Sequence, residues 1–412
     1  MTEGLSRRGL FAGAGAAGAV GLVAGGLFGA GATRNSSGPD PARELMLAAG
    51  GPAEGLVPAL GTPTPAHVHV VAVDLTADTP SAVAEQARTV LEEWHDRARE
   101  LHESGLASVV EGAPTQGLRP ASLGVTLGLG PSLLERAGLE DRRPEALADP
   151  PAFDTDRLDP ALCGGDLMLH VGAEDPVVVG SAVRHLLGRV RGHTRVRWSL
   201  PGFQRSAAAA EDPSATPRNL MGQIDGTVNP SPGEAVFSPQ VLASHTDPAQ
   251  AWMDGGTYVV VRRIRMLLDD WFDLSKGERE RVVGRRLDDG APLGGDREED
   301  LPDLSARDED GEPVIPADAH IRLAGSESTM GARMLRRGFN YDLGLGADGE
   351  PDTGLLFTAW QGDPNTGFTA VQRRLDEGGD ALNRYVRHEG SAVFAVPPLR
   401  DDEPFVSHGL WT

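Results

Sequence analysis

The first half of the chain contains short apolar or alternating stretches, separated by two longer segments in which apolar residues recur every three to four positions. A period of two is typical of strands, and a period near 3.6 is typical of amphipathic helices. The predicted order is strand, helix, strand, strand, helix, strand, which is the order of a split βαβ, or ferredoxin-like, unit. The strands are predicted at 67–75, 122–130, 166–175 and 194–200, and the helices from Thr79 to Gly105 and over 176–190.

The second half repeats this order, and it repeats some of the letters as well. GVTLGLG in the first half resembles NYDLGLG in the second, and DLMLHVGAEDP resembles GLLFTAWQGDP. Such a repeat indicates duplication of one unit. We therefore predict an α+β fold of two duplicated ferredoxin-like halves, of the dimeric α+β barrel type, with antiparallel sheets and peripheral helices. The second set of elements is predicted at 257–267 (strand), from Ser275 to Arg286 (helix), at 339–346 and 353–364 (strands), 367–377 (helix) and 392–399 (strand).

Changes in composition divide the chain into four segments. Residues 1–32 contain an apolar run rich in Gly and Ala, and residues 33–65 have the Gly, Pro and Ser content of a linker or loosely packed arm. The folded body is expected to begin near His67. It is expected to comprise an N-terminal half over 66–215 and a C-terminal half over 216–412.

Arg7 and Arg8 stand just before the apolar run, which closes with the small residues AGA at 30–32. Together these features resemble a twin-arginine (Tat) signal peptide. The run is also long enough to cross a bilayer, so a membrane anchor is the alternative, but its Gly and Ala content favours the signal. The Tat machinery is thus an expected partner, and the protein is expected to be extracellular or in the cell envelope or periplasm. This route carries folded proteins, which suits a cofactor inserted before export.

The charge balance and the cysteine content exclude several classes of function. The formal net charge is −22, and Lys276 is the only lysine, so nearly all the basic residues are arginine. This balance argues against nucleic acid or an anionic membrane as a partner. Cys163 is the only cysteine, which excludes an intramolecular disulfide, a Cys-rich zinc site and a Cys-ligated iron–sulfur cluster.

An acidic insertion lies between the predicted elements of the C-terminal half, over 287–319. It carries twelve acidic residues, with Arg297 and Arg307 as its only bases after Asp288. The insertion lacks the regular spacing of a calcium loop, so a solvated loop without a metal is expected. His320 follows it directly and precedes Arg336 by sixteen residues, which distinguishes it from the other ten histidines.

Several motifs in this order resemble the dye-decolourising peroxidases, including the branch of exported, deferrochelatase-like members. They are GQIDGT (222–227), AHIRLAG (319–325), MLRRGFNYDLG (334–344), GLLFTAWQGDP (354–364) and the helix GFTAVQRRL (367–375). Their order along one chain is far more specific than any one of them. The resemblance covers nearly the whole body from His67 onward, and it includes the duplicated ferredoxin-like halves.

The resemblance implies one haem b per chain, bound by the C-terminal half. It places His320 as the proximal ligand of the haem iron, Asp225 as the distal acid and Arg336 as the distal arginine, which also contacts the cofactor. Gly226 would let the backbone approach the porphyrin closely. Arg337 is the rival for the distal role, because neighbouring residues in a strand point to opposite faces.

The resemblance also implies a carboxylate that accepts a hydrogen bond from the proximal imidazole, about sixty residues further on. Asp380 is the candidate, with Asp376 and Glu377 as rivals. The chain departs from many relatives at two places. Gln223 occupies a position where many carry Phe, and Gly338 stands where another branch has a distal Asn.

Three functions are compatible with these motifs. The first is a peroxidase that reduces hydrogen peroxide and oxidises dyes, phenols or other aromatic donors in one-electron steps. The second is deferrochelatase-like release of iron from haem, and the third is a non-catalytic haem carrier. The presence of both Asp225 and Arg336 favours the first, because a carrier needs His320 alone. The oligomeric state stays open.

Overall fold

The structure is a computed structural model that describes residues 56–61, 63–104, 110, 112–206, 209–212, 215–347, 349–400 and 402–412. The predicted signal over 1–32, and residues 33–55 of the predicted arm, lie outside the described residues. Within the described ranges, no helix combines the length and the apolar character needed to span a membrane.

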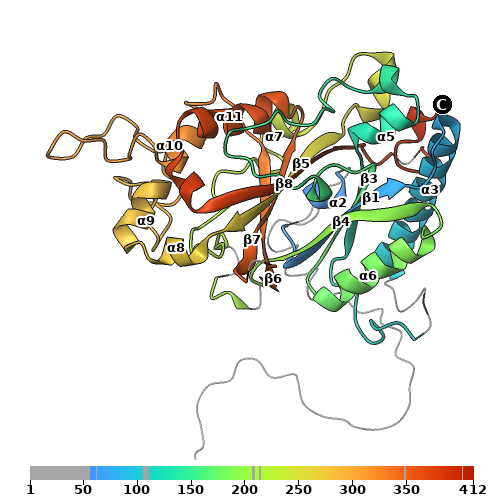
Figure 1. The fold of residues 1–412 in the computed structure, drawn as a ribbon, viewed down its shortest axis with the longest axis horizontal. Helices are drawn as coiled ribbons and strands as arrows, with labels where there is room; N and C mark the ends of the chain where they lie inside the picture. Colours follow the sequence, from blue (N-terminus) through green and yellow to red (C-terminus); the bar gives the residue numbers. More distant parts are fainter. Residues whose placement is uncertain are drawn as a thin grey trace, which may run out of the picture. The chain divides into compact units, whose positions relative to one another are not determined.

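The N-terminal half forms one antiparallel sheet whose strands lie in the order β4-β1-β3-β2. Two helices run across this sheet, as the right-hand part of Figure 1 shows. The elements are β1 (His67–Leu75), α3 (Pro80–Ser104), β2 (Gly124–Leu129), β3 (Leu167–Ala173), α6 (Pro176–Arg189) and β4 (Thr194–Phe203). Short helices also occur at α5 (Pro131–Arg136), η1 (Glu140–Arg142) and η2 (Pro160–Leu162).

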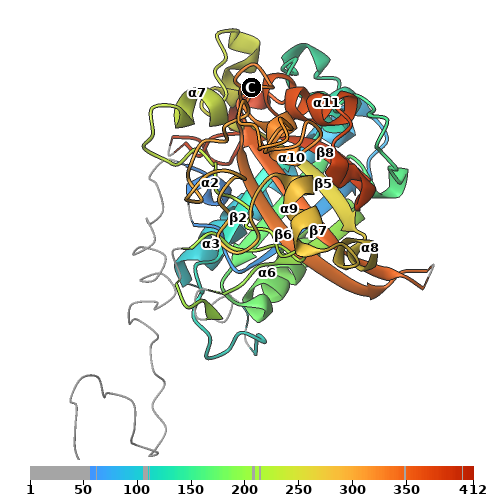
Figure 2. The ribbon, with the colours of Figure 1, turned by 90° about the vertical axis from the view of Figure 1, so that its left-hand side faces the viewer.

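The C-terminal half has the same strand order, β8-β5-β7-β6. Its helices are short, and α9 and α10 lie in front of its strands in Figure 2. The elements are α7 (Phe237–Val241), η4 (Pro248–Met253), β5 (Thr257–Met266), α8 (Leu268–Phe272), α9 (Lys276–Val283), α10 (His320–Ala324), β6 (Leu335–Leu345), β7 (Pro351–Gln361), the π-helical turn η5 (Asn365–Thr369), α11 (Ala370–Glu377), η6 (Ala381–Arg384), β8 (Val386–Val396) and η7 (His408–Leu410). The predicted fold class is therefore confirmed.

The two sheets close into a barrel through two narrow contacts between strands. Leu129 of β2 pairs with Ala395 of β8, and Phe203 of β4 pairs with Asn340 of β6. Large apolar side chains from both sheets fill the space between them, so the barrel is a packed core rather than a channel. They include Trp198, Phe339, Tyr341, Leu356, Trp360 and Phe394.

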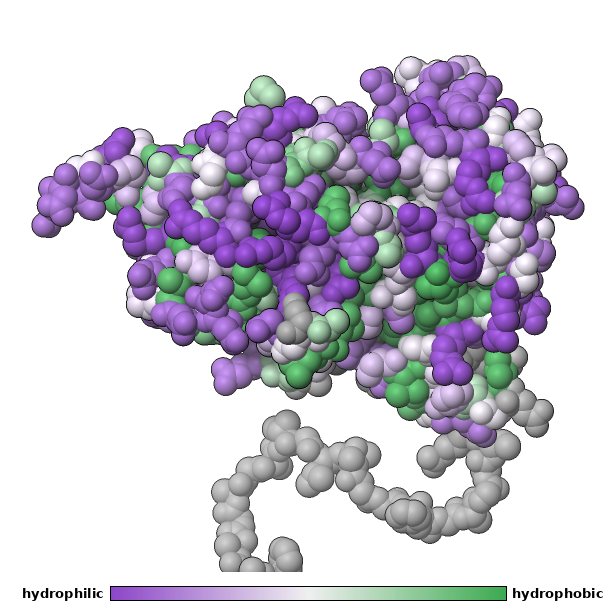
Figure 3. Space-filling model, viewed as in Figure 1, coloured by the Kyte–Doolittle hydropathy of each residue, from purple (hydrophilic) through white to green (hydrophobic). Residues whose placement is uncertain are grey.

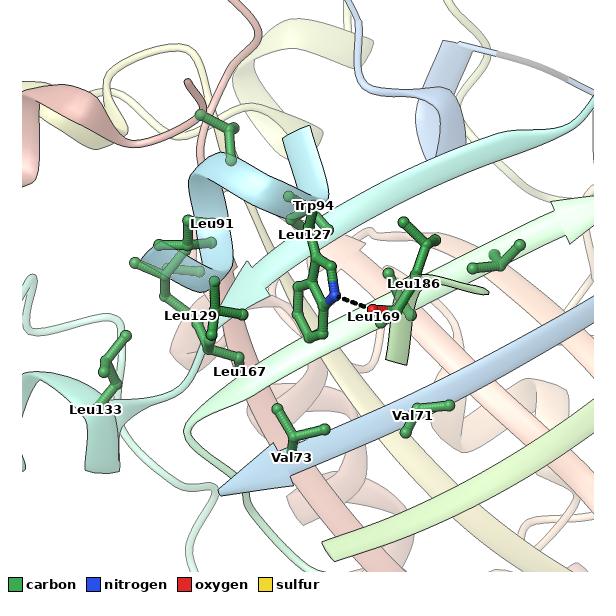
Figure 4. Packing of buried hydrophobic residues seen from close by; sticks show 14 of the residues in the cluster. Val71, Val73, Leu91, Trp94, Leu127, Leu129, Leu133, Leu167, Leu169 and Leu186 are labelled. Atoms are coloured by element: carbon green, nitrogen blue, oxygen red, sulfur yellow. Dashed lines mark hydrogen bonds between the residues drawn. The ribbon is translucent and has the colours of Figure 1, made fainter. Parts of the chain in front are cut away.

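A second core lies between the N-terminal sheet and its helices (Figure 4). Trp94 of α3 is completely buried, and its indole N–H donates to the Leu186 carbonyl of α6 at 3.0 Å. The apolar residues of α3 recur at helical spacing and meet the outward-facing residues of the strands. The strand residues labelled in the figure are Val71, Val73, Leu127, Leu129, Leu167 and Leu169, and the helix residues labelled beside Trp94 are Leu91, Leu133 and Leu186.

One element was not predicted, and two strands begin several residues earlier than the sequence predicts. The short helix α2 (Pro58–Gly61) lies within the predicted arm, and its Leu60 packs into the barrel core. β6 starts at Leu335 instead of 339, and β8 starts at Val386 instead of 392. Both extensions are rich in charged residues, which hides them from a search for apolar alternation.

The acidic insertion projects between α9 and α10 at the left of Figure 1. The same region of the space-filling view is coloured mostly as hydrophilic (Figure 3). The first residues of the insertion, however, pack against the body. Arg285 and Pro292 form an isolated bridge there, and Ala291 is buried.

Candidate functional site

Alternation along β6 separates the two neighbouring arginines. Arg337 is buried and donates a hydrogen bond to the Leu60 carbonyl at 3.2 Å, on the barrel side of the sheet. Arg336 and Gly338 therefore face the opposite, outer side. A Cβ atom at Gly338 would lie 3.6 Å from an Asp225 carboxylate oxygen, so Asp225 lies on the same side as Arg336.

The turn that carries Asp225 needs glycine. Gly226 has φ = 123°, a left-handed value that other residues rarely adopt. The Asp225 amide donates to the Pro217 carbonyl at 2.9 Å, which folds the segment back on itself. The Asn219 side-chain amide donates to the Asp225 carboxylate at 3.4 Å. The backbone thus presents this carboxylate in a defined direction.

Asn229 joins this turn to the strand that carries Arg336. Its amide nitrogen donates to the Arg336 carbonyl at 2.8 Å, and its amide oxygen accepts from the Arg336 backbone N–H at 3.0 Å. Two hydrogen bonds from one side chain fix both position and orientation. The turn and β6, more than a hundred residues apart in sequence, are therefore held in register.

His320 begins α10 and pairs with a buried carboxylate. Its Nδ1 lies 2.7 Å from Asp380 Oδ2, and the Asp380 side chain is only 2% exposed. The other Asp380 oxygen accepts from the Leu382 amide at 3.0 Å, which fixes the carboxylate. Asp376, a rival in the sequence, instead accepts the amides of Asp154 and Thr155. The predicted pairing of His320 with Asp380 is confirmed as a hydrogen bond.

The charges around His320 have opposing effects on its protonation. Burial alone would lower the pKa of His320, but the charge and hydrogen bond of Asp380 outweigh it and raise the pKa above its usual value. The charge of Arg336 lowers this pKa and the charge of Asp225 raises it, each by less than Asp380 does. Both side chains are therefore within electrostatic reach of the imidazole.

The chemistry of these residues fits a haem group. Although its Nδ1 is held by the buried Asp380, the His320 side chain is 29% exposed, so part of the imidazole stays open to a ligand. When Nδ1 donates to Asp380, Nε2 is the nitrogen left to bind a metal. An imidazole with an anionic partner is a common axial ligand of haem iron, and a carboxylate and a guanidinium lie within reach of it.

Two solved structures are similar to this fold over most of its length. Ferric DtpA from Streptomyces lividans is 44% identical, has a TM-score of 0.81, and the match covers 87% of this chain and 97% of that chain. A DyP-type peroxidase from Cellulomonas bogoriensis is 41% identical with a TM-score of 0.77, covering 87% of this chain and 96% of that chain. The fold and site thus define the class: an enzyme of the peroxidase type, built from two ferredoxin-like halves.

Family models place the chain within this class. The model described as Dyp-type peroxidase, N-terminal, matches residues 58–204, and that described as Dyp-type peroxidase, C-terminal, matches residues 216–401. The dye-decolorizing peroxidase of Thermobifida fusca (strain YX) is 53% identical over 97% of this chain and 96% of its own length. The deferrochelatase of Escherichia coli (strain K12) is 38% identical over 71% of this chain and 70% of its own length. The chain belongs to the Dyp-type peroxidase family.

Sequence reasoning missed the residues that hold the site in place. Asn219 and Asn229 flank the GQIDGT motif, and their proximity to it was the one available signal. Glu298 lies in the acidic insertion, where nothing in the sequence distinguishes it from its acidic neighbours. Its hydrogen bond to Thr227 spans 71 residues of sequence.

Proposed function

We propose that the chain binds one haem b through His320 and reduces hydrogen peroxide, with Asp225 and Arg336 as catalytic residues. Aromatic compounds such as dyes or phenols are the electron donors. The observation that carries this proposal is that Asp225 lies on the Arg336 side of β6, and that the charges of both act on the imidazole of the His320–Asp380 pair. Bound haem supplies the redox centre at which the O–O bond is cleaved.

The His320–Asp380 pair sets the electronic character of the proximal side. The Nδ1–H donates to a carboxylate that is itself held by the Leu382 amide. An anionic acceptor makes the imidazole a stronger electron donor through Nε2. The same hydrogen bond fixes the tautomer and the ring orientation.

Asp225 and Arg336 act on peroxide at the distal side. A carboxylate oxygen of Asp225 takes a proton from one peroxide oxygen and delivers it to the leaving oxygen, a type of assistance worth about 10²–10⁴-fold. The Arg336 guanidinium stabilises negative charge that develops as the bond breaks. Gly226, by its left-handed φ, would let the backbone of the turn approach a bound porphyrin.

Release of iron from haem is the second candidate, and its support is the similarity to the deferrochelatases. The paired Asp225 and Arg336 favour peroxidase chemistry, because neither iron release nor simple carriage requires both. Free protoporphyrin appearing under reducing conditions would favour the second candidate.

Export through the Tat pathway is part of the proposal, with the Tat machinery as partner and the cell exterior or envelope as destination. Its support is the twin arginine at Arg7 and Arg8 and the run that follows. Replacing both with lysine should abolish export of the haem-loaded protein, measured by cell fractionation. Export that persists would remove the Tat assignment without affecting the catalytic proposal.

The catalytic proposal is tested with haem-loaded Asp225→Asn and Arg336→Ala variants. Each should retain the haem absorption spectrum but react with hydrogen peroxide at least about a hundredfold more slowly in stopped flow. Asp342→Asn and Arg333→Ala, at exposed positions on or beside the same strand, are the matched controls. Unchanged peroxide rates in both site variants, with haem bound, would overturn the assigned roles.

A further inference from the structure

A hydrogen bond joins the acidic insertion to the turn that carries Asp225. The Thr227 hydroxyl donates to a carboxylate oxygen of Glu298 at 2.7 Å. Thr227 lies two residues after Asp225, and Glu298 lies in the insertion that the sequence predicts to be a solvated loop. One acidic residue of that loop thus reaches back to the distal side of the site.

Arg285 holds the backbone of Glu298 in place. The buried Arg285 guanidinium donates from one nitrogen to the carbonyls of Gly290 and Glu298, at 2.6 and 2.8 Å. Burial lowers the pKa of Arg285, and the nearby Glu298 opposes that shift. The backbone at Glu298 is therefore anchored independently of its contact with Thr227.

Packing reinforces this hydrogen bond. A Cβ atom at Gly290 would lie 2.9 Å from the Ile224 side chain and 3.3 Å from the Glu298 Cγ, so three segments meet there with no spare volume. Gly290 also has φ = 73°, which glycine adopts readily. On the other side of the turn, Arg218 donates to the Asp288 carbonyl at 2.8 Å.

We infer that Glu298 is a positioning residue for the distal acid: its carboxylate holds Thr227, and through it the Gly226 turn, so that Asp225 stays on the Arg336 side of β6. The insertion is then part of the catalytic architecture rather than a solvated appendage. Asn229 fixes the turn against β6, and Glu298 fixes it from the opposite direction. This inference rests on the proposed role of Asp225.

The test uses haem-loaded protein and two independent measurements. Thr227→Val and Glu298→Ala each remove the hydrogen bond, whereas Thr227→Ser and Glu298→Gln can retain it. Glu299→Ala, at the exposed neighbouring position, is the matched control. Amide hydrogen exchange over residues 218–227 reports the order of the turn directly, and stopped-flow reaction with hydrogen peroxide reports its consequence.

Thr227→Val and Glu298→Ala should exchange these amides about tenfold faster and react with peroxide about tenfold more slowly, as expected for one lost hydrogen bond. The double variant should be no worse than either single variant, because both changes remove the same interaction. Thr227→Ser, Glu298→Gln and Glu299→Ala should resemble the unmodified protein.

Two results would overturn the inference. Unchanged exchange and peroxide rates in Thr227→Val and Glu298→Ala would show that the contact does not position the turn. Glu298→Gln as damaging as Glu298→Ala would show that the negative charge matters, rather than the hydrogen bond. Asp225→Asn run in parallel separates the two proposals: if it too leaves the peroxide rate unchanged, the proposed role of Asp225 fails, whatever Glu298 does.

Discussion

The two halves share one strand order but cover their sheets differently. In the N-terminal half, α3 has 25 residues and α6 has 14, and they bury the outer face of the sheet in a continuous apolar core. In the C-terminal half, α9 and α11 have eight residues each and α10 has five. Short helices leave part of the outer face of that sheet to polar side chains.

This contrast shows how a duplicated unit can divide stability from chemistry. Long amphipathic helices gain free energy by burying an apolar stripe, and they leave no room for a ligand. Where the helices are short, connecting segments such as 284–319 and 378–385 take over, and they bring Glu298 and Asp380 toward the site. The C-terminal half then depends on hydrogen bonds across long sequence separations.

The largest expected effect is the loss of haem when His320 is replaced. His320→Ala removes the imidazole that is proposed to bind the haem iron, so tight haem binding should be lost. Retention of the Soret absorbance through gel filtration measures it. His95→Ala, on α3 of the N-terminal half, is the matched control and should bind haem normally. Equal haem retention in both variants would break the assignment of chemistry to the C-terminal half.

Truncation of the core in the N-terminal half should have a smaller effect of another kind. Trp94→Ala removes a completely buried indole and leaves the Leu186 carbonyl without its donor. It should lower the free energy of unfolding by about 3–5 kcal/mol. The measurement is denaturant unfolding, with Glu92→Ala at an exposed position of the same helix as control.

If the two halves divide stability from chemistry, Trp94→Ala should change the stability and leave the haem site unchanged. At low denaturant, haem-loaded Trp94→Ala should keep the absorption spectrum and peroxide rate of the unmodified protein. A changed haem spectrum in the folded variant would show that the loss at Trp94 reaches the site through the apolar core that the two halves share.

The fold was predictable because its signals are local and repeated. The strand at 67–75 has the bounds predicted from its alternation, and α6 was predicted to within a residue. The beginnings of β6 and β8 were missed because Arg336, Arg337 and His388 lie there, and these polar residues interrupt the apolar pattern. The helix α10 was not predicted, because five residues without a side-chain cap carry little helical signal.

The site was predictable only where a motif marks it. The motifs of the resemblance identified the candidates Asp225, His320 and Arg336. They also narrowed the carboxylate partner of His320 to three neighbouring acids, Asp376, Glu377 and Asp380. Whether Asp380 or Asp376 pairs with His320 depends on how the chain turns after α11, which the sequence does not specify. Contacts such as Thr227 with Glu298 join segments whose relative positions are set only by the complete fold.

The smallest expected effect concerns two histidines, one in each half, whose pKa values shift in opposite directions. His170 of β3 faces the barrel interior against Trp360, at 5.7 Å between ring centroids. Burial, helped by the charge of Arg337, lowers the pKa of His170 to about 4. Asp380 raises the pKa of His320 instead.

The two shifts give opposite pH dependences in haem-free protein. The folded state resists protonating His170, so its contribution to stability is present above about pH 6.5 and is lost as the pH falls toward 4, by roughly 3 kcal/mol. His320 gains a partner on protonation, so its contribution is present below the unfolded pKa and is lost as the pH rises through the raised folded value.

Urea unfolding of haem-free protein between pH 8 and 4.5 checks both signs. Relative to the unmodified protein, His170→Gln should become less destabilised as the pH falls, whereas His320→Gln should become more destabilised. The absolute cost of each substitution cancels, because only its slope with pH is compared. Parallel slopes would mean that the pKa values of His170 and His320 do not shift in opposite directions. The contrast between a half built for packing and a half built for chemistry would then fail at its two most comparable residues.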